Sequence, residues 1–499
     1  MQKIKKINKL IITTLIALTM AITINIVEAK AEETYGDWGY EVLTDGTLMI
    51  VSYTGDEINI DIPEKIKGKT VTQIYSSAFS GRQYDGNMAT VSIPATINYI
   101  EDYAFSFGYI EKIDVSESNP YYCVKDGVLY DKNMKTLIFY PNKYGKFNIP
   151  NGVETISYGA FDEAISLTEI YIPKSVKNVE YAFGRLPGLK SVEVSDKNTK
   201  YSSVDGVIFN KKGTELIYYP TAKHISYETY YVPNKVKTIS SYAFAGCYYL
   251  RNIYLPEGLT TIESGAFSDI IDLEYVYIPK STKNIGGLKS GEENEFFDYA
   301  FDGCNNLTIC SDKNSFAKEY AEENNISWEE AVFLKNAKVK LEKTSYEYDK
   351  NLKLPNISIK YKNKELKKYQ DYVITYKNNK NIGKATVIIQ GQGKYIGTIK
   401  KTFTIKPKKI SGLKQEATKK KTSIKMTWKK SPKVTGYEVY RSTKVNGTYK
   451  KIKSLKNNSY TNKKLKSDTE YYYKVRAYKT VKGKKIYSQF SKTVVMKTK

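Results

Sequence analysis

The sequence offers few residues suited to catalysis. Its single histidine, His224, lies in a polar stretch after Pro220. A histidine base needs a nucleophile and an orienting acid, and no motif around His224 supplies them. A dyad with Cys123 or Cys247 is formally possible, but both cysteines fit better as core residues of a repeat. An enzyme with an unrecognised site stays open as the least favoured alternative.

Carboxylates are plentiful but scattered in turns, such as Glu292-Glu293 and Glu322-Glu323. A glycosidase would need two of them on opposite sides of a bond. Asp126-Gly127 and Asp205-Gly206 lack the alternating acidic ligands of a calcium loop, and there is no phosphate loop, zinc spacing or dinucleotide fingerprint. We therefore predict that the chain is not an enzyme and has no catalytic, cofactor-binding or metal site.

Two anchors recur in register along the first two thirds of the chain. The dipeptide Ala-Phe occurs at 78–79, 104–105, 160–161, 182–183, 243–244, 266–267 and 300–301. An aliphatic residue before proline occurs at 62–63, 93–94, 149–150, 172–173, 232–233, 255–256 and 278–279. A fixed period of this kind is typical of a solenoid, in which each coil becomes stable by stacking on the next.

One coil shows how the repeat works. Leu250, Ile253 and Leu255 point inward from a short strand that Pro256 ends. Ile262 makes a second inward contact, and then Ala266-Phe267 fills the space between coils. Two coils carry an insert, at 124–141 and 204–220, whose paired β-rich runs predict a hairpin. Because Cys247 and Cys304 share one repeat position, we favour free, buried thiols over disulfides.

These anchors resemble the BspA-like branch of leucine-rich repeats from bacterial surface proteins. The resemblance covers about 57–330 and implies a solenoid. Residues 42–50 look like an N-terminal capping hairpin, and residues 315–325 like a terminal helix over the last coil. The stretch from Ile285 to Glu295 departs from the repeat and lengthens one loop.

Two β-rich modules follow the repeats. Residues 333–407 resemble bacterial Ig-like spacer modules, through the run Asp371-Tyr372 … Asn378-Asn379 … Gly391-x-Gly393-x-Tyr395. Residues 408–499 resemble a fibronectin type III domain, with Trp428 on an early strand and Tyr471 as the tyrosine corner. The expected fold class is mainly β: a leucine-rich-repeat solenoid (32–330) followed by two β-sandwich modules.

The N-terminus predicts export. Lys3 to Lys9 form a basic region, an apolar run follows from Leu10 to Val27, and Ala29-Lys30-Ala31 makes a small-x-small site. We expect residues 1–31 to be a cleaved signal peptide. An uncleaved membrane anchor is the alternative. No later segment is long and apolar enough to span a bilayer, and neither a lipobox cysteine nor an LPxTG-like sorting tail occurs.

Charge is distributed very unevenly. Residues 331–499 hold 46 basic and nine acidic residues, a net charge of +37, whereas residues 32–330 have a net charge of −16. Nearly all of these basic residues are lysines. A lysine ammonium group cannot form the paired, planar hydrogen bonds by which arginine recognises a base. We expect no specific nucleic-acid binding, but electrostatic attachment of 331–499 to anionic cell-wall polymers.

Together these features predict a secreted or cell-surface binding protein, extracellular or loosely associated with the wall of a Gram-positive bacterium. The solenoid would bind a protein or glycan, and the rear modules would act as spacer and anchor. A purely structural envelope protein is the alternative. Tyrosines could supply rigid contacts or merely pack between coils: Tyr121, Tyr122, Tyr218, Tyr219, Tyr230, Tyr231, Tyr248 and Tyr249. The sequence leaves the ligand and the oligomeric state open.

Overall fold

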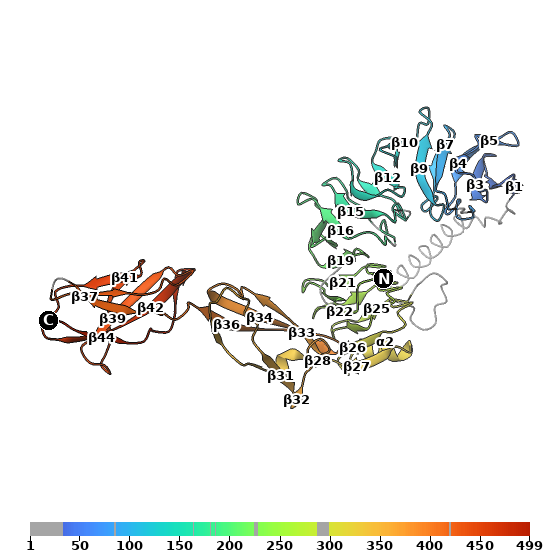
Figure 1. Ribbon diagram of the computed structural model, residues 1–499. Helices are drawn as coiled ribbons and strands as arrows, with labels where there is room; N and C mark the ends of the chain where they lie inside the picture. Colours follow the sequence, from blue (N-terminus) through green and yellow to red (C-terminus); the bar gives the residue numbers. More distant parts are fainter. Residues whose placement is uncertain are drawn as a thin grey trace, which may run out of the picture.

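The computed structural model describes residues 33–499 apart from 84–85, 163, 180, 185, 224–227, 287–298 and 419–420. The predicted signal peptide, His224 and most of the long loop after Ile285 therefore lie outside the described residues. What is described is almost entirely β-structure: a curved stack of coils followed by two separate β-modules (Figure 1).

The coils stack their strands into two parallel ladders. In the first ladder, each strand in a complete coil precedes an anchor proline. It contains β4 (Asn59–Asp61), β7 (Ala89–Ile93), β9 (Ile110–Val115), β13 (Gly145–Asn148), β15 (Leu167–Ile172), β16 (Ser191–Val194), β20 (Thr229–Tyr231), β22 (Asn252–Tyr254), β24 (Tyr275–Tyr277), β26 (Thr308–Ser311) and β27 (Ser327–Glu330). The order is β4-β7-β9, β13-β15-β16 and β20-β22-β24-β26-β27, so this ladder is broken twice.

The second ladder is broken at the same two coils. Its strands are β3 (Leu48–Tyr53), β6 (Lys69–Ile74), β8 (Tyr99–Ile100), β12 (Thr136–Phe139), β14 (Thr155–Ile156), β19 (Glu215–Tyr218), β21 (Thr238–Ile239), β23 (Thr261–Ile262) and β25 (Asn284–Ile285). β12 and β14 form one piece, which a bridge from Thr155 to Asn178 extends, and β19-β21-β23-β25 form the next.

Both breaks coincide with the predicted inserts, which are antiparallel hairpins. They comprise β10 (Tyr122–Lys125) with β11 (Val128–Asp131), and β17 (Tyr201–Val204) with β18 (Val207–Asn210). A buried asparagine begins each one. Asn198 Nδ2 donates to the carbonyls of Pro173 and Val176, both at 2.9 Å, in the preceding coil, while its Oδ1 accepts from two backbone amides of the hairpin. Asn119 makes the same four bonds one insert earlier.

The core between the ladders is a stack of aromatic rings. Phe244, Phe267 and Phe301 are buried, with centroids 5.0 and 4.9 Å apart. The alanine before each one is also fully buried, because a larger side chain there would separate the coils. The repeated Ala-Phe anchor therefore places one ring per coil in a continuous column, as the sequence predicts.

Both ends of the solenoid are covered. β1 (Glu33–Tyr35), β2 (Trp38–Val42) and β3 form an antiparallel cap on the first coil. β5 (Lys65–Ile66) pairs with β6 beside it. At the other end lies helix α2 (Phe316–Glu323), at the position predicted from the sequence. Ser315 caps it by accepting a hydrogen bond from Lys318 N at 3.3 Å.

The four cysteines carry free thiols. Cys247 and Cys310 are buried, whereas Cys123 and Cys304 are half-buried. Burial raises the pKa of the Cys304 thiol to about 11 and that of Cys310 to about 12. Thiols in such surroundings stay protonated and act as packing residues. The predicted burial holds for Cys247 and Cys310, whereas Cys123 and Cys304 are less buried than predicted.

The middle module (333–407) docks directly onto the end of the solenoid. Its four-stranded sheet has the order β30-β36-β34-β33, and β29-β31-β32 packs beside it. The strands are β29 (Lys338–Leu341), β30 (Ser345–Glu347), β31 (Ile357–Tyr361), β32 (Lys364–Glu365), β33 (Tyr372–Lys377), β34 (Gly383–Gly391) and β36 (Thr398–Lys406). A short pair, β28 (Val332–Phe333) with β35 (Tyr395–Ile396), joins it to the chain leaving the last coil.

The C-terminal module (408–499) is a two-sheet sandwich. One sheet is β37-β38-β41: β37 (Lys414–Ala417), β38 (Ile424–Thr427) and β41 (Ser459–Asn462). The other contains β40 (Lys450–Leu455), β39 (Gly436–Ser442), β42 (Glu470–Val481), β43 (Lys484–Tyr487) and β44 (Val494–Lys497). The Tyr471 hydroxyl accepts a hydrogen bond from Lys466 N at 3.0 Å, the corner contact that the sequence predicts.

Candidate ligand-binding groove

A groove of about 970 Å³ opens where the second ladder breaks at the second insert. Asn178 and Val179 form one edge, and Asn210, Glu215 and Ile217 form the other. Tyr201 of the inserted hairpin bridges the break: its hydroxyl donates to Lys177 O at 3.2 Å and accepts from Val179 N at 3.3 Å. The insert thus holds two parts of the solenoid apart and leaves a lined hollow between them.

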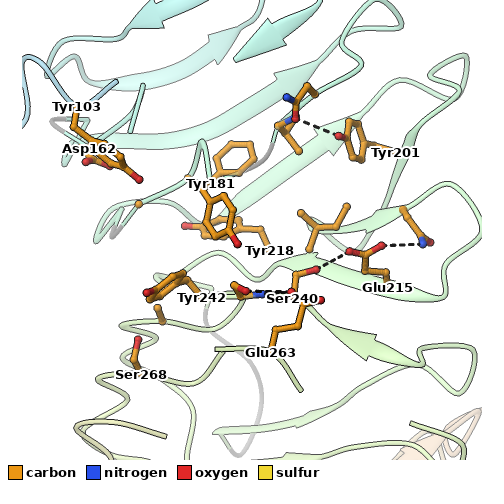
Figure 2. Close-up of a pocket in the computed structure, with 18 of the residues that line it drawn as sticks. Tyr103, Asp162, Tyr181, Tyr201, Glu215, Tyr218, Ser240, Tyr242, Glu263 and Ser268 are labelled. Carbon is orange, nitrogen blue, oxygen red and sulfur yellow. Dashed lines mark hydrogen bonds between the residues drawn. The ribbon is translucent and has the colours of Figure 1, made fainter. Parts of the chain in front are cut away.

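Tyrosines from successive coils form one wall of this groove. Tyr103, Tyr181 and Tyr242 each stand immediately before an Ala-Phe anchor and are labelled in Figure 2. Tyr158 completes the series: its ring stacks on Tyr181 with centroids 5.0 Å apart, and Tyr181 meets Tyr242 edge-on at 6.2 Å. Tyr103 and Tyr181 are each 38% exposed, so their rings are accessible.

The backbone explains why these rings face outward. Tyr103, Tyr181 and Tyr242 have φ of 62°, 50° and 56°, in the left-handed region that side chains rarely adopt. Glycine occupies the same position at Gly159 and Gly265, with φ of 63° and 60°. The turn before these five anchors therefore takes a positive φ whatever the residue, and a tyrosine there is strained.

Three carboxylates lie among the tyrosines. Glu215 Oε1 accepts from Ser240 Oγ at 2.9 Å, and Glu263 Oε2 accepts from Ser241 N at 2.9 Å. Asp162 Oδ2 accepts from Ser106 Oγ at 3.0 Å. Figure 2 shows Asp162 beside Tyr103, with Glu215 and Glu263 across the groove near Ser240. These hydrogen bonds orient the three acids without neutralising them.

Burial raises the pKa values of two residues in the groove lining, Asp162 and Tyr218. Desolvation raises the pKa of Asp162 to about 6, against a smaller opposite effect of the Ser106 hydroxyl. Tyr218 lies behind Tyr181 in Figure 2, stacked on Phe183 with centroids 4.9 Å apart. Its hydroxyl is buried beside Thr221, and burial raises its pKa well above the usual range. A carboxylate whose pKa is raised by burial in a lined hollow makes this groove the candidate binding site.

Tyr103, Tyr158, Tyr181 and Tyr242 are not among the eight contact tyrosines predicted from the sequence, whereas Tyr218 is. Of those eight, Tyr122, Tyr218 and Tyr219 are buried, and Tyr230 and Tyr231 are half-buried in packed clusters. Tyr121, Tyr248 and Tyr249 are exposed, at 50%, 49% and 44%. The usable signal was the residue before Ala-Phe, which is tyrosine at positions 103, 181, 242 and 299.

The described residues contain no group of three or more histidine, cysteine or carboxylate side chains that could hold a metal ion. The groove lining has carboxylates and hydroxyls but, among the residues described, neither histidine nor cysteine. Within the described part of the chain, no helix has the length and apolar character required to cross a membrane.

Stacked coils with a column of buried phenylalanines, a lined groove and sandwich modules behind define a leucine-rich-repeat protein with a β-sandwich tail. The repeats are of the BspA type: the profile of the "BspA type Leucine rich repeat region" matches six copies, over residues 58–143, 132–211 and 199–289. The fibronectin type III domain profile matches residues 408–494. The chain thus contains BspA-type leucine-rich repeats over residues 58–289 and a fibronectin type III domain over residues 408–494.

Solved structures include similar proteins. The pneumococcal vaccine antigen PcpA is 23% identical, over 56% of this chain and 81% of that one, with a TM-score of 0.33. A leucine-rich repeat protein from Eubacterium ventriosum has the same identity and TM-score, over 56% of this chain and 78% of its own. A Fn3-like protein from Clostridium thermocellum is 28% identical over 17% of this chain and 86% of its own, with a TM-score of 0.16. No curated protein matches the chain.

Modules of these two families are typically non-enzymatic binding or structural units. Proteins with BspA-type repeats are typically secreted by bacteria or displayed on their surface.

Proposed function

We propose that the chain is an exported, adhesin-like binding protein, whose tyrosine-lined groove binds a protein or glycan partner. The observation that carries this proposal is the row formed by Tyr103, Tyr158, Tyr181 and Tyr242 beside three carboxylates. Rigid aromatic faces contribute a large contact area at low entropic cost, and the oriented acids supply directional contacts.

The rear modules, 331–499, hold the protein on anionic polymers of the wall of a Gram-positive bacterium through their net charge of +37. Binding of this kind is screened by salt. The acidic solenoid is repelled by the same polymers, which keeps the groove turned toward other partners.

The groove is tested with the full chain, labelled and applied to arrays of glycans and of extracellular proteins. The variant Tyr181→Ala/Tyr242→Ala should lose the signals that depend on the groove. The matched control is Tyr121→Ala/Tyr248→Ala, which removes two exposed tyrosines from elsewhere on the solenoid. If the groove variant keeps every signal of the unmodified chain, the groove is not the binding site.

Wall attachment is tested by sedimenting the full chain with purified Gram-positive cell walls across a salt series. We expect binding at low salt that is lost as the salt concentration rises through a few tenths molar. Absence of binding at every salt concentration would contradict the anchoring role and leave the groove proposal standing.

A further inference from the structure

The described lining of the groove is acidic without compensation. It includes Asp162, Glu215 and Glu263, but no lysine, arginine or histidine. Elsewhere on the solenoid, carboxylates pair with cations across coils: Glu154 with Lys135, and Arg251 with both Glu228 and Glu274. The groove therefore differs from the ordinary surface of the solenoid in the absence of such pairs among its described residues.

Of the three carboxylates, Asp162 is the one whose charged form is most disfavoured by burial. It lies close against Gly184 and Gly159, where an added Cβ would collide with its carboxylate at the first and crowd it at the second. Its hydrogen bond comes from a neutral hydroxyl, that of Ser106. Among the described residues this half-buried carboxylate has no counter-charge, so a cation that reaches it would stabilise it, whereas a neutral ligand would desolvate it further.

The tyrosine wall favours the same kind of ligand. The face of an aromatic ring attracts an ammonium group, and several rings around one position strengthen the attraction. Tyr103 and Tyr181 present exposed rings on the groove wall that also holds Asp162. A carboxylate beside exposed ring faces matches a primary ammonium group better than an uncharged sugar.

The chain itself carries such groups in excess. Residues 331–499 have 46 basic side chains, nearly all lysine, against nine acidic ones. Of these two rear modules, the middle one is docked at the last coils and the C-terminal one lies beyond it, away from the solenoid (Figure 1). In this arrangement they do not reach the groove of their own chain, but they are free to meet the groove of another.

We propose that the groove binds lysine side chains of the rear modules of a second copy of this chain. The inference rests on the proposed function, since it names the partner of the same groove. The contact is head-to-tail: one copy contributes its solenoid and the next its tail, so that further copies add in the same way and form open chains. Attraction between the solenoid of one copy (net charge −16) and the rear modules of the next (net charge +37) brings the two copies together. The groove then determines where the lysine side chains bind.

Sedimentation velocity of the full chain at low salt tests this. The unmodified protein should sediment faster as its concentration rises, and salt should reverse the effect. The variant Asp162→Asn/Glu215→Gln/Glu263→Gln keeps the shapes of the three acids, and we expect at least about tenfold weaker self-association. The control Glu111→Gln/Glu117→Gln/Glu193→Gln makes the same change of charge at exposed positions outside the groove lining and should associate like the unmodified chain. Circular dichroism checks that each variant is folded.

A second measurement uses pentalysine as a competitor. It should dissociate the oligomers of the unmodified protein and bind the groove variant at least tenfold more weakly than the control. A chain that is monomeric at every concentration, or a control as impaired as the groove variant, would overturn the inference. Either result would leave the array experiment to decide whether the groove binds anything else.

Discussion

The hydroxyl of Tyr231 donates a 2.8 Å hydrogen bond to the carbonyl oxygen of Gly391, a residue 160 positions further along the chain. The hydroxyl of Tyr254, one coil later, donates a 3.0 Å hydrogen bond to the carbonyl oxygen of Gly393. Asn252 Oδ1 accepts from Gly393 N at 3.3 Å, and Lys394 pairs with Glu329 at 3.2 Å. The outward tyrosines of the first ladder thus form a platform for the loop after β34, which fixes the middle module on the solenoid.

We therefore predict that Tyr231→Phe/Tyr254→Phe loosens this junction. Each substitution keeps the ring and removes one hydroxyl, at a cost of about 1 kcal/mol. Small-angle scattering should show a broader distribution of shapes, and proteolysis near residues 331–334 should become faster. Tyr121→Phe, at an exposed ring, is the control.

Gly391→Ala is a stronger version of the same test, because its Cβ would collide with the carbonyl oxygen of Tyr395. Scattering and cleavage unchanged in both junction variants would mean that the two tyrosine hydroxyls do not hold the module in place.

The buried asparagines Asn119 and Asn198 provide a second prediction. Each satisfies two carbonyls of the previous coil and two amides of its own hairpin. Asn198→Ala leaves these buried groups without partners, so we expect the free energy of unfolding to fall by about 2–4 kcal/mol. Urea denaturation measures this. The exposed Asn133→Ala is the control, and an equal loss in both variants would argue against the structural role.

The raised pKa of Asp162 makes a third prediction. Its pKa rises from 3.8 to about 6 on folding, so the folded protein binds this proton more tightly than the unfolded chain does. The contribution of this group to stability is therefore present below about pH 4 and is lost as the pH rises through 6. Asp162→Asn removes that dependence, so the melting temperature of the unmodified protein relative to the variant should increase from pH 7 to pH 4.

The exposed Asp272→Asn is the matched control for the loss of one carboxylate. Parallel pH profiles of the unmodified protein and Asp162→Asn would show that Asp162 is not the group responsible.

The pKa of Glu438 in the fibronectin type III domain is shifted in the opposite direction, downward. It is 1% exposed and accepts hydrogen bonds from Arg476 at 2.8 Å and from Lys485 at 3.1 Å. Burial by itself would raise its pKa, but the hydrogen bonds from these cations outweigh burial and lower the pKa to about 2. Its contribution to stability is therefore present above about pH 4.5 and is lost as the pH falls toward 2.

Glu438→Gln should cost the domain about 3–5 kcal/mol at neutral pH, because it leaves Arg476 without its buried counter-charge. Thermal denaturation, followed through near-ultraviolet circular dichroism of the aromatic core around Trp428, measures the loss. Glu416→Gln removes an exposed acid from the same domain and should have little effect. A similar melting temperature for both variants would count against the ion cluster as a source of stability.

Much of this architecture could be predicted from the sequence. Phe244, Phe267 and Phe301 recur because every coil buries the same face against the next, so the periodic pattern carries the packing. The helix at Phe316–Glu323 and the corner contact of Tyr471 follow from local rules of the same kind. Contacts between equivalent residues of successive coils, and contacts between residues close in the sequence, can therefore be predicted from the pattern along the chain.

The groove could not be predicted in this way. Tyr181 and Tyr218 are both tyrosines beside core residues, yet the first is exposed and the second buried. The difference arises from the left-handed turn at Tyr181 and from the inserted hairpin, which sets the distance between the coils. The junction of Tyr231 with Gly391 joins segments that no repeat relates. The sequence by itself determined the coils, since their contacts are periodic, while only the tertiary structure decided the groove and the junction, because both depend on how non-repeating segments interrupt or cover the stack.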